Sequence, residues 1–190
     1  TDDKILKKIN RECTTQDTIN ALELLRNCCY KMDIHLMPNL PGSTPEIDNE
    51  MFDRILHSDD LHADQWKIYP CEITPWTVIQ KWAENGTYQP YSTEVLSQVL
   101  INCKSQMKPW IRLNRVVRDI PSQYVLTDED DPNLRQTLAK RMKEQGKRCQ
   151  CIRCREIRND LTDDNEIEFV TRTYRAGKGT EYFLSFETDN

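Results

Sequence analysis

The stretch QDTINALELLRNCCYKMDIHLMPNLPGSTPEIDNEMFDRILHS, residues 16–58, contains a helix, a strand, a loop and a second helix in that order. Apolar residues recur at helical spacing in its first third and then alternate in KMDIHLMP, which predicts a helix followed directly by a strand. Pro and Gly in NLPGSTPE end the strand, and Thr44 and Pro45 suit the cap and first turn of a new helix. The apolar positions that define the two helices are Ile19, Leu22, Leu25 and Cys29 in the first, and Ile47, Met51 and Ile55 in the second.

The alternation continues along the chain. ADQWKIYPCEI (residues 63–73) predicts a short strand, and STEVLSQVLINCKSQM (92–107) predicts a helix capped by Ser92 or Thr93. WIRLNRVVRDI (110–120) predicts another strand. Helices and strands at the period of βα units indicate the α/β class, with a parallel sheet covered by helices, open or barrel-like.

The last third of the chain has a different character. The acidic loop DEDDPN (128–133) precedes a basic helix, LRQTLAKRMKEQ (134–145), which should end near Gly146. EIEFVTRTYRAGKGTEYFLSFET (166–188) then predicts two antiparallel strands joined at AGKG. We expect a boundary between residues 146 and 165, and the hairpin beyond it is too small to be stable alone.

Length and composition limit the class of protein. A chain of 190 residues can hold one full core and a smaller piece, and it opens on Thr1 rather than Met, so we expect an excised or processed part of something longer. Eight cysteines in a core-rich chain without a signal peptide indicate a reducing compartment. No apolar run approaches the roughly 20 residues that span a bilayer. We therefore expect a soluble, cytoplasmic protein.

The segment RCQCIRCREI (148–157) places three cysteines close enough to bind one metal ion. Thiolates of Cys149, Cys151 and Cys154 could converge on zinc at about 2.3 Å if the chain turns. Reactive thiols, unreactive reduced cysteines and an iron–sulfur cluster are the alternatives, and the usual C-x₂-C runs of such a cluster are absent. Candidates for a fourth ligand are Cys103, Cys71, His57, His62 and water.

Basic residues gather around the same segment. The net charge is −5, yet residues 140–158 hold eight Lys and Arg against two Glu. In RLNRVVR, strand alternation puts Arg112 and Arg118 on one face, while Arg115 falls on the other unless a bulge turns it. Such a surface could bind a nucleic-acid backbone, or it could be a solvated edge that pairs with Asp119. The candidate phosphate contacts are Arg112, Arg115, Arg118, Lys147, Arg148, Arg153 and Arg155.

Two segments lie where predicted strands run into loops, the end of a parallel sheet where ligands bind. HLMPNLPG contributes the loop from Met37 to Asn39, and WKIYP places Lys67 and Tyr69 on one side by alternation. A cation and a phenol could thus share a cofactor pocket. Alternatively, Lys67 pairs with Asp64 and Tyr69 packs.

Residues with no assigned chemistry are expected to serve packing. His35 reads as a core histidine beside Asp33 rather than a ligand. The four tryptophans, Trp66, Trp76, Trp82 and Trp110, read as core or domain-contact residues rather than base-stacking platforms.

Five blocks, in order, resemble the catalytic subunit of Elongator, a family of tRNA-modifying radical S-adenosylmethionine enzymes with an acetyltransferase domain. They are DDKILKKINRECT, MDIHLMPNLPG, WKIYPCEITPWTVIQKW, PWIRLNRVVRDIPSQY and RCQCIRCREI. The resemblance implies the second half of a partial (β/α) barrel in residues 1–127, a basic cysteine linker in 128–164, and the incomplete start of an acetyltransferase-like domain, an antiparallel hairpin, in 165–190.

The resemblance also implies a chemistry. A deoxyadenosyl radical from S-adenosylmethionine and an acetyl unit from acetyl-CoA would yield a carboxymethyl-type group on the wobble uridine of tRNA. The three linker cysteines would bind zinc, and Met37, Asn39, Lys67 and Tyr69 would line the cofactor mouth. Expected partners are tRNA and, in addition, other Elongator subunits or the missing parts of the same enzyme.

Two family motifs are absent from this sequence. No cysteine trio has the C-x₃-C-x₂-C spacing that ligates a [4Fe–4S] cluster, and the glycine-rich acetyl-CoA loop is missing. We expect the isolated chain to be inactive. A non-catalytic tRNA-binding or assembly module is one alternative, and a part of another radical S-adenosylmethionine enzyme of the coproporphyrinogen-oxidase-like kind is a second.

Overall fold

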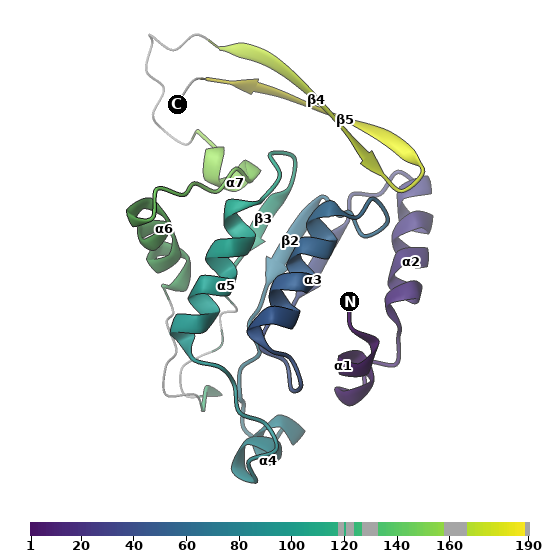
Figure 1. Ribbon diagram of the computed structural model, residues 1–190. Helices are drawn as coiled ribbons and strands as arrows, with labels where there is room; N and C mark the ends of the chain where they lie inside the picture. Colours follow the sequence, from purple (N-terminus) through teal and green to yellow (C-terminus); the bar gives the residue numbers. More distant parts are fainter. Residues whose placement is uncertain (118–119, 121–123, 127–132, 158–166, 189–190) are drawn as a thin grey trace.

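The computed structural model describes residues 1–117, 120, 124–126, 133–157 and 167–188 (Figure 1). A three-stranded sheet, a set of helices and a separate two-stranded hairpin make up these residues. In chain order the elements are α1 (Asp3–Lys8), α2 (Thr15–Asn27), β1 (Asp33–Leu36), α3 (Pro45–His57), β2 (Gln65–Ile68), α4 (Val78–Glu84), α5 (Thr93–Ser105), β3 (Arg112–Arg115), α6 (Leu134–Glu144), α7 (Ile152–Arg155), β4 (Glu168–Ala176) and β5 (Gly179–Glu187).

The sheet is parallel, with strand order β1-β2-β3. Helices α3 and α5 lie over one of its faces, in front of β2 and β3 in Figure 1. Trp66, Ile68 and Leu113 are fully buried on that face, and Phe52 of α3 and Leu100 of α5 pack into the same core. The predicted α/β class, a parallel sheet followed by a cysteine segment and an antiparallel hairpin, is confirmed.

The helix starts follow the capping residues in the sequence. The Thr44 side chain accepts the N–H of Ile47 at 3.3 Å with Pro45 at the first helical position, and Ser92 caps α5. Side-chain oxygens at these positions satisfy backbone donors that the first turn of a helix leaves unpaired. Both predicted helix starts are confirmed, and of the two predicted caps for α5 the structure uses Ser92.

The predicted buried faces are only partly right. Leu22 is buried in α2, but Leu25 is 41% exposed and Cys29 is exposed. In α3 the buried face includes Phe52 and the acidic Asp48, which the apolar pattern leaves out. The buried face of α3 is rotated from the predicted one, because α3 packs against α5 and because Asp48 has polar partners in two loops.

The second face of the sheet is polar. It carries an ion pair of 2.7 Å between Lys67 Nζ and Asp33 Oδ2, and Asn114 Nδ2 donates to Gln65 Oε1 at 2.6 Å. His35, predicted to be in the core, is exposed on this face, so that prediction was wrong. Parallel sheets in single-domain α/β folds are usually apolar on both faces. The sheet described here therefore has one apolar face and one polar face.

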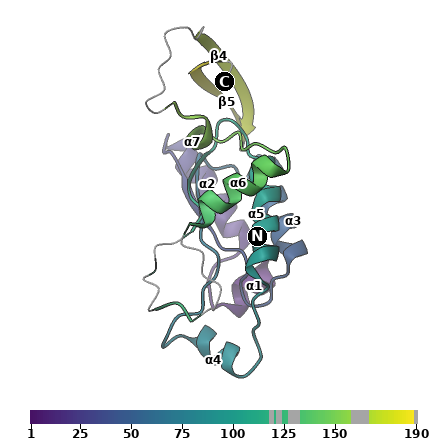
Figure 2. The same ribbon diagram turned by 90° about the vertical axis from the view of Figure 1, so that its left-hand side faces the viewer.

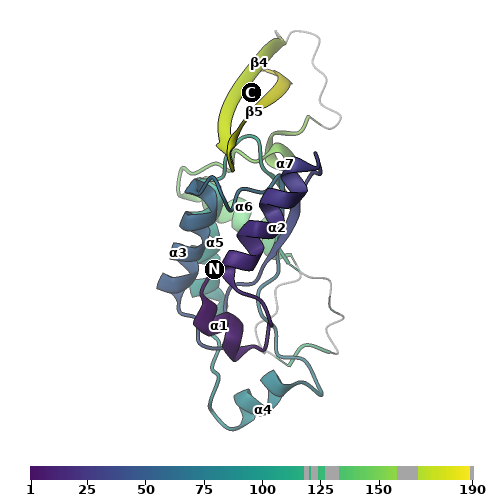
Figure 3. The ribbon, with the colours of Figure 1, turned by 90° about the vertical axis from the view of Figure 1, so that its right-hand side faces the viewer.

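The hairpin of β4 and β5 lies at the opposite end of the molecule from α4 (Figure 3). Its two-residue turn follows from Gly177, whose φ of +57° suits the tight connection predicted at AGKG. The Gly177 N–H donates to Asp59 O at 2.7 Å, and the Tyr174 ring stacks on Trp110 with centroids 4.5 Å apart. These contacts attach the hairpin to the core.

Two of the four tryptophans play the packing roles expected of them. Trp66 is fully buried, and Trp110 contacts the hairpin. Trp76, by contrast, is 88% exposed, so it is not part of the core, and its predicted alternative role as a domain contact stays a prediction. It has a positive φ of 63° just before α4, a backbone geometry that the apolar pattern does not reveal.

Helix α6 packs beside α5 through Leu134, Leu138 and Met142 and leads into the cysteine segment (Figure 2). Gly146, with φ of +65°, lies just after its end, as expected. Among the described residues, no helix is both long and apolar enough to cross a membrane.

Candidate metal centre and its surroundings

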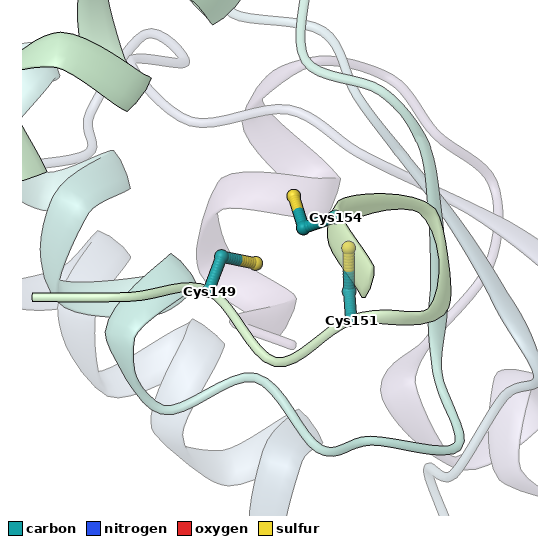
Figure 4. A group of neighbouring side chains, drawn as sticks. All are labelled: Cys149, Cys151 and Cys154. Atoms are coloured by element: carbon teal, nitrogen blue, oxygen red, sulfur yellow. The ribbon is translucent and has the colours of Figure 1, made fainter. Parts of the chain in front are cut away.

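The three cysteines of the linker lie on one short turn that contains α7 (Figure 4). Their sulfur atoms are all within 4.8 Å of one another. Cys149 and Cys151 are buried, and Cys154 is exposed. The Ile152 N–H donates to Ile111 O at 3.0 Å, which fixes the turn to the start of β3. The chain therefore makes the turn that convergence of the thiolates requires.

Contacts among the thiols set their protonation. Hydrogen bonds from Cys149 and Cys151 hold the pKa of Cys154 well below that of an ordinary thiol. The same contacts, together with burial, raise the pKa of Cys149. One sulfur of the trio is thereby favoured as a thiolate, the form that binds a metal ion. Soft thiolate donors at this spacing fit zinc better than magnesium or calcium.

The four protein candidates for a fourth ligand do not join the trio. His57 hydrogen-bonds to its own helix, His62 packs against the hairpin, and Cys71 follows β2. Burial and, less strongly, Cys151 raise the pKa of Cys103 in α5 to about 12, but the Cys103 sulfur does not belong to the group of sulfur atoms within 4.8 Å of one another. With Cys154 exposed, the fourth position of a bound ion would open to water.

Arg155 connects the cysteine turn to the rest of the molecule. Its guanidinium donates to Gln150 O at 2.9 Å and to Pro109 O at 2.8 Å, and it forms an ion pair of 2.7 Å with Glu187 of β5. Arg172 binds the same carboxylate at 2.6 Å, and these partners lower the pKa of Glu187 to about 2. The turn, the core and the hairpin therefore meet at one carboxylate.

Two more of the predicted phosphate contacts have partners within the chain. Arg153 donates to the backbone oxygen of Asn114, and Arg112 contacts Glu156 at 3.3 Å. Because acceptors of the chain itself bind these two guanidinium groups, the contacts favour a structural role for Arg112 and Arg153.

The remaining four predicted contacts are Arg115, Arg118, Lys147 and Arg148. Arg115 and Arg148 are exposed and Lys147 is half-buried. The pairing of β2 with β3 shifts by one residue at Asn114, which is the kind of bulge that the sequence analysis considered before Arg115. Arg118 lies outside the described residues.

The predicted cofactor residues lie at the carboxyl ends of β1 and β2. Lys67 pairs with Asp33, and Lys31 rather than Lys67 pairs with Asp64, so the predicted alternative pairing was wrong. The Tyr69 ring contacts His35 edge-on with centroids 5.3 Å apart. This polar edge could hold the amino acid part or the hydroxyls of a nucleoside cofactor.

The buried carboxylate of Asp48 holds the loop after β1 in place. Met37 is 40% exposed, but Asn39 is only 6% exposed and its amide contacts the backbone of Tyr91. Asp48 accepts the Asn39 N–H at 2.7 Å and the Tyr91 O–H at 2.7 Å. Asn39 therefore positions the loop, while Met37 presents a side chain at its surface.

Sequence reasoning missed two buried charged residues. Asp48 supports the loop after β1, and Lys104, 2% exposed, lies in the last turn of α5. Each falls at helical spacing from core residues, four before Phe52 and four after Leu100. A charge inside a buried stripe was the signal that could have identified both.

Comparison with known proteins supports this organisation. Residues 63–144 match the model of the Radical_SAM C-terminal domain. A tRNA uridine(34) acetyltransferase of Methanocaldococcus infernus is 38% identical over 97% of this chain, which covers 36% of that protein. Elongator complex protein 3 of Saccharomyces cerevisiae is 31% identical over 96% of the chain, which covers 34% of that relative.

A solved structure agrees with these matches. The archaeal Methanocaldococcus infernus Elp3 with an N-terminal deletion superposes on this chain with a TM-score of 0.90 at 37% sequence identity. The superposition covers 97% of this chain and 45% of the Elp3 chain. The chain is therefore homologous, over nearly all of its own length, to part of the tRNA uridine(34) acetyltransferases and Elongator complex protein 3, and it spans about a third of the length of these relatives.

Proposed function

We propose that this chain is the part of a tRNA wobble-uridine-modifying enzyme that carries the second half of the radical S-adenosylmethionine barrel, a metal-organised linker and the start of the acetyltransferase domain. The full enzyme would install a carboxymethyl-type group from acetyl-CoA. The observation that carries the proposal is the match over 97% of the chain to a tRNA uridine(34) acetyltransferase. Eight free thiols fit a reducing location such as the cytoplasm.

The polar face of the sheet would contribute to binding S-adenosylmethionine. Lys67, Tyr69 and Met37 lie at its carboxyl edge, and Asn39 holds the loop that bears Met37. The linker thiolates would hold zinc, which supplies a fixed centre around which the turn folds. Partners in this scheme are tRNA, the remaining parts of the enzyme and other Elongator subunits.

The residues present do not fit an iron–sulfur cluster or acetyl-CoA. Among the described residues, one group of three metal-ligating side chains exists, the linker trio, and its C-x-C-x₂-C spacing differs from the cluster motif. We expect no reductive cleavage of S-adenosylmethionine by the isolated chain supplied with iron, sulfide and dithionite. Formation of 5′-deoxyadenosine under these conditions would disprove this expectation.

A non-catalytic tRNA-binding or assembly module is the second candidate, because the basic linker could serve that role without either active site. Flanking sequence in the same gene separates the two. Flanks that supply the cluster and acetyl-CoA motifs would favour the enzyme, and flanks that lack them would favour the module.

The basic surface predicts a salt dependence of tRNA binding. Changing Lys147 and Arg148 to Ala should reduce the slope of log affinity against log salt by about 0.7–0.9 for each phosphate contact that is lost. Fluorescence anisotropy with labelled tRNA at several salt concentrations measures this slope. Exposed Lys4 and Lys7 of α1, which lie outside the basic surface of residues 140–158, control for net charge when they are changed to Ala together. Equal slopes for the two double variants would refute a specific role of Lys147 and Arg148.

A further inference from the structure

Strand β3 forms one edge of the parallel sheet. The strand order is β1-β2-β3, and no further strand pairs with β3 among the described residues. The Arg112 N–H donates to Asp64 O at 2.9 Å, so the backbone groups of Arg112 face β2. Because successive residues of a strand direct their backbone groups to opposite sides, those of Ile111 and Leu113 face outward. Such outward groups can bind another strand unless something covers them.

The linker, residues 128–164, covers this edge. Three carbonyl groups at alternate positions accept hydrogen bonds from it, namely Pro109 O from Arg155 at 2.8 Å, Ile111 O from the Ile152 N–H at 3.0 Å, and Leu113 O from Arg135 at 3.2 Å. This alternation is the pattern that a neighbouring strand would produce, although only one of the three donors is a backbone amide. The linker therefore takes the place of a strand beside β3.

A bulge at Asn114 limits the covered edge. The pairing of β2 with β3 shifts by one residue at this point, and the Asn114 carbonyl accepts hydrogen bonds from Arg135 at 3.4 Å and from Arg153. Bulges and charged side chains are two means by which native proteins keep edge strands from pairing with other chains. The donors on β3 thus come from α6 and from the turn that contains α7, and both helices belong to the linker.

The strand under this cover is apolar. Ile111 and Leu113 are fully buried and Val116 is 2% exposed. We infer that the outer edge of β3 is a strand-binding edge occupied by the linker, and that the partner it fits once uncovered is β3 of a second copy of this chain. A two-fold axis between the copies would pair the two strands antiparallel, because each copy then uses the same surface. The inference rests on contacts within the chain and needs no bound metal.

A double variant can remove two of the three donors with little other change. Residue 152 is the first of α7, and Cys151 before it has φ of −61° and ψ of 154°, so Ile152→Pro fits the backbone and removes the N–H. Arg135→Met removes the second donor. Sedimentation velocity at several concentrations should show dimers of this variant that are at least about tenfold tighter than those of the wild-type chain, because displacing the linker breaks fewer hydrogen bonds.

A matched double variant controls for the changes in side chain. Ile152→Ala keeps the backbone amide, and Arg141→Met removes an arginine of α6 that pairs with Glu94 instead of β3. This variant should associate no more tightly than the wild-type chain. Should the first double variant fail to fold, Ile152→Pro alone, compared with Ile152→Ala, tests one donor in the same way.

A peptide identifies the surface that associates. Fluorophore-labelled PWIRLNRV, residues 109–116, should bind the uncovered double variant at least about tenfold more tightly than the wild-type chain, and should compete with dimerisation. A copy that is N-methylated at Ile111 and Leu113 loses two backbone donors and should not bind.

Three outcomes would contradict the inference. A double variant that stays monomeric and does not bind the peptide would overturn it. Dimers that the peptide does not compete with would overturn it as well, because the contact would then lie elsewhere. A monomeric double variant that binds the peptide would overturn the second copy as the partner, while the strand-binding edge stands.

Discussion

Changing Cys149, Cys151 and Cys154 together to Ser is expected to abolish zinc binding, with a loss of affinity of more than about a thousandfold. Serine hydroxyls stay protonated at neutral pH and are harder donors than thiolates, so they do not replace the three sulfurs that lie within 4.8 Å of one another. Elemental analysis of the purified chain and titration with a chelator measure the loss. One zinc per wild-type chain and none in the variant is the expected result.

Loss of the metal should also loosen the contact between the linker and the hairpin. Arg155 directly follows Cys154 and binds both Pro109 O and Glu187, so its position depends on the cysteine turn. Without the metal, the ordered turn rests on few backbone contacts. Amide hydrogen exchange should become faster in residues 149–157 and in β5, while the buried β2 stays protected.

A second triple variant provides the control. Cys13, Cys28 and Cys29 are free thiols outside the cluster, and changing them to Ser removes the same number of sulfur atoms. This variant should keep its zinc and its tRNA affinity. If the linker variant binds tRNA as tightly as the control, the basic residues alone hold the RNA and the cysteines have no part in binding.

The sequence predicted the order of the elements well, because period and capping are local properties. The starts of α3 and α5 and the turn of the hairpin follow from Thr44, Ser92 and Gly177, each of which acts within its own segment. The convergence of the three cysteines could also be expected, since they lie within six residues of one another. Local chemistry thus sufficed for the elements and for the metal candidate.

The surroundings of the site could not be predicted in the same way, because they depend on partners far away in the sequence. From the sequence, Arg155 is a candidate phosphate contact, and only the folded structure shows that it forms an ion pair with Glu187 of the hairpin. The sequence predicts a core position for His35 if both faces of a parallel sheet are assumed to be covered. In the structure, the face that carries Asp33 and Lys67 is polar. Family resemblance identifies the relatives of the chain, but it does not reveal these contacts.

Replacing Asp48 by Ala is expected to lower the free energy of unfolding by about 2–4 kcal/mol, the cost of leaving several buried donors without an acceptor. Asp48 is 3% exposed and accepts three hydrogen bonds, from the Asn39 N–H, the Tyr91 O–H and, at 2.8 Å, the Ser43 O–H. The Asn39 backbone has a positive φ of 65°, and its N–H has no alternative acceptor among the recorded contacts of the described residues. Urea unfolding followed by tryptophan fluorescence measures the change.

Because Asp48 titrates, its contribution to the stability of the chain depends on pH. Burial raises the pKa of Asp48 above its ordinary value of 3.8 in spite of the three hydrogen bonds. The stability that this group contributes is therefore complete below 3.8 and is lost as the pH rises through the raised pKa of the folded state. Relative to Asp48→Asn, which does not titrate, the wild-type chain should gain stability as the pH falls from 7 towards that window. A stability difference between these two chains that does not change with pH would contradict the raised pKa.

Asp53→Ala on the same helix isolates the effect of burial. The Asp53 side chain is 63% exposed and contacts only His57 among the recorded ion pairs of the described residues, so its removal should cost less than about 0.5 kcal/mol. Both variants remove one carboxylate from α3 and add the same helix-favouring residue, which leaves the hydrogen-bond network of Asp48 as the difference between them. Because that network joins the loop after β1 to the segment before α5, its loss should also make the Met37 loop more accessible to proteolysis in Asp48→Ala than in Asp53→Ala. Equal stability and equal cleavage of the two variants would show that Asn39 and Tyr91 hold the loop without the buried carboxylate.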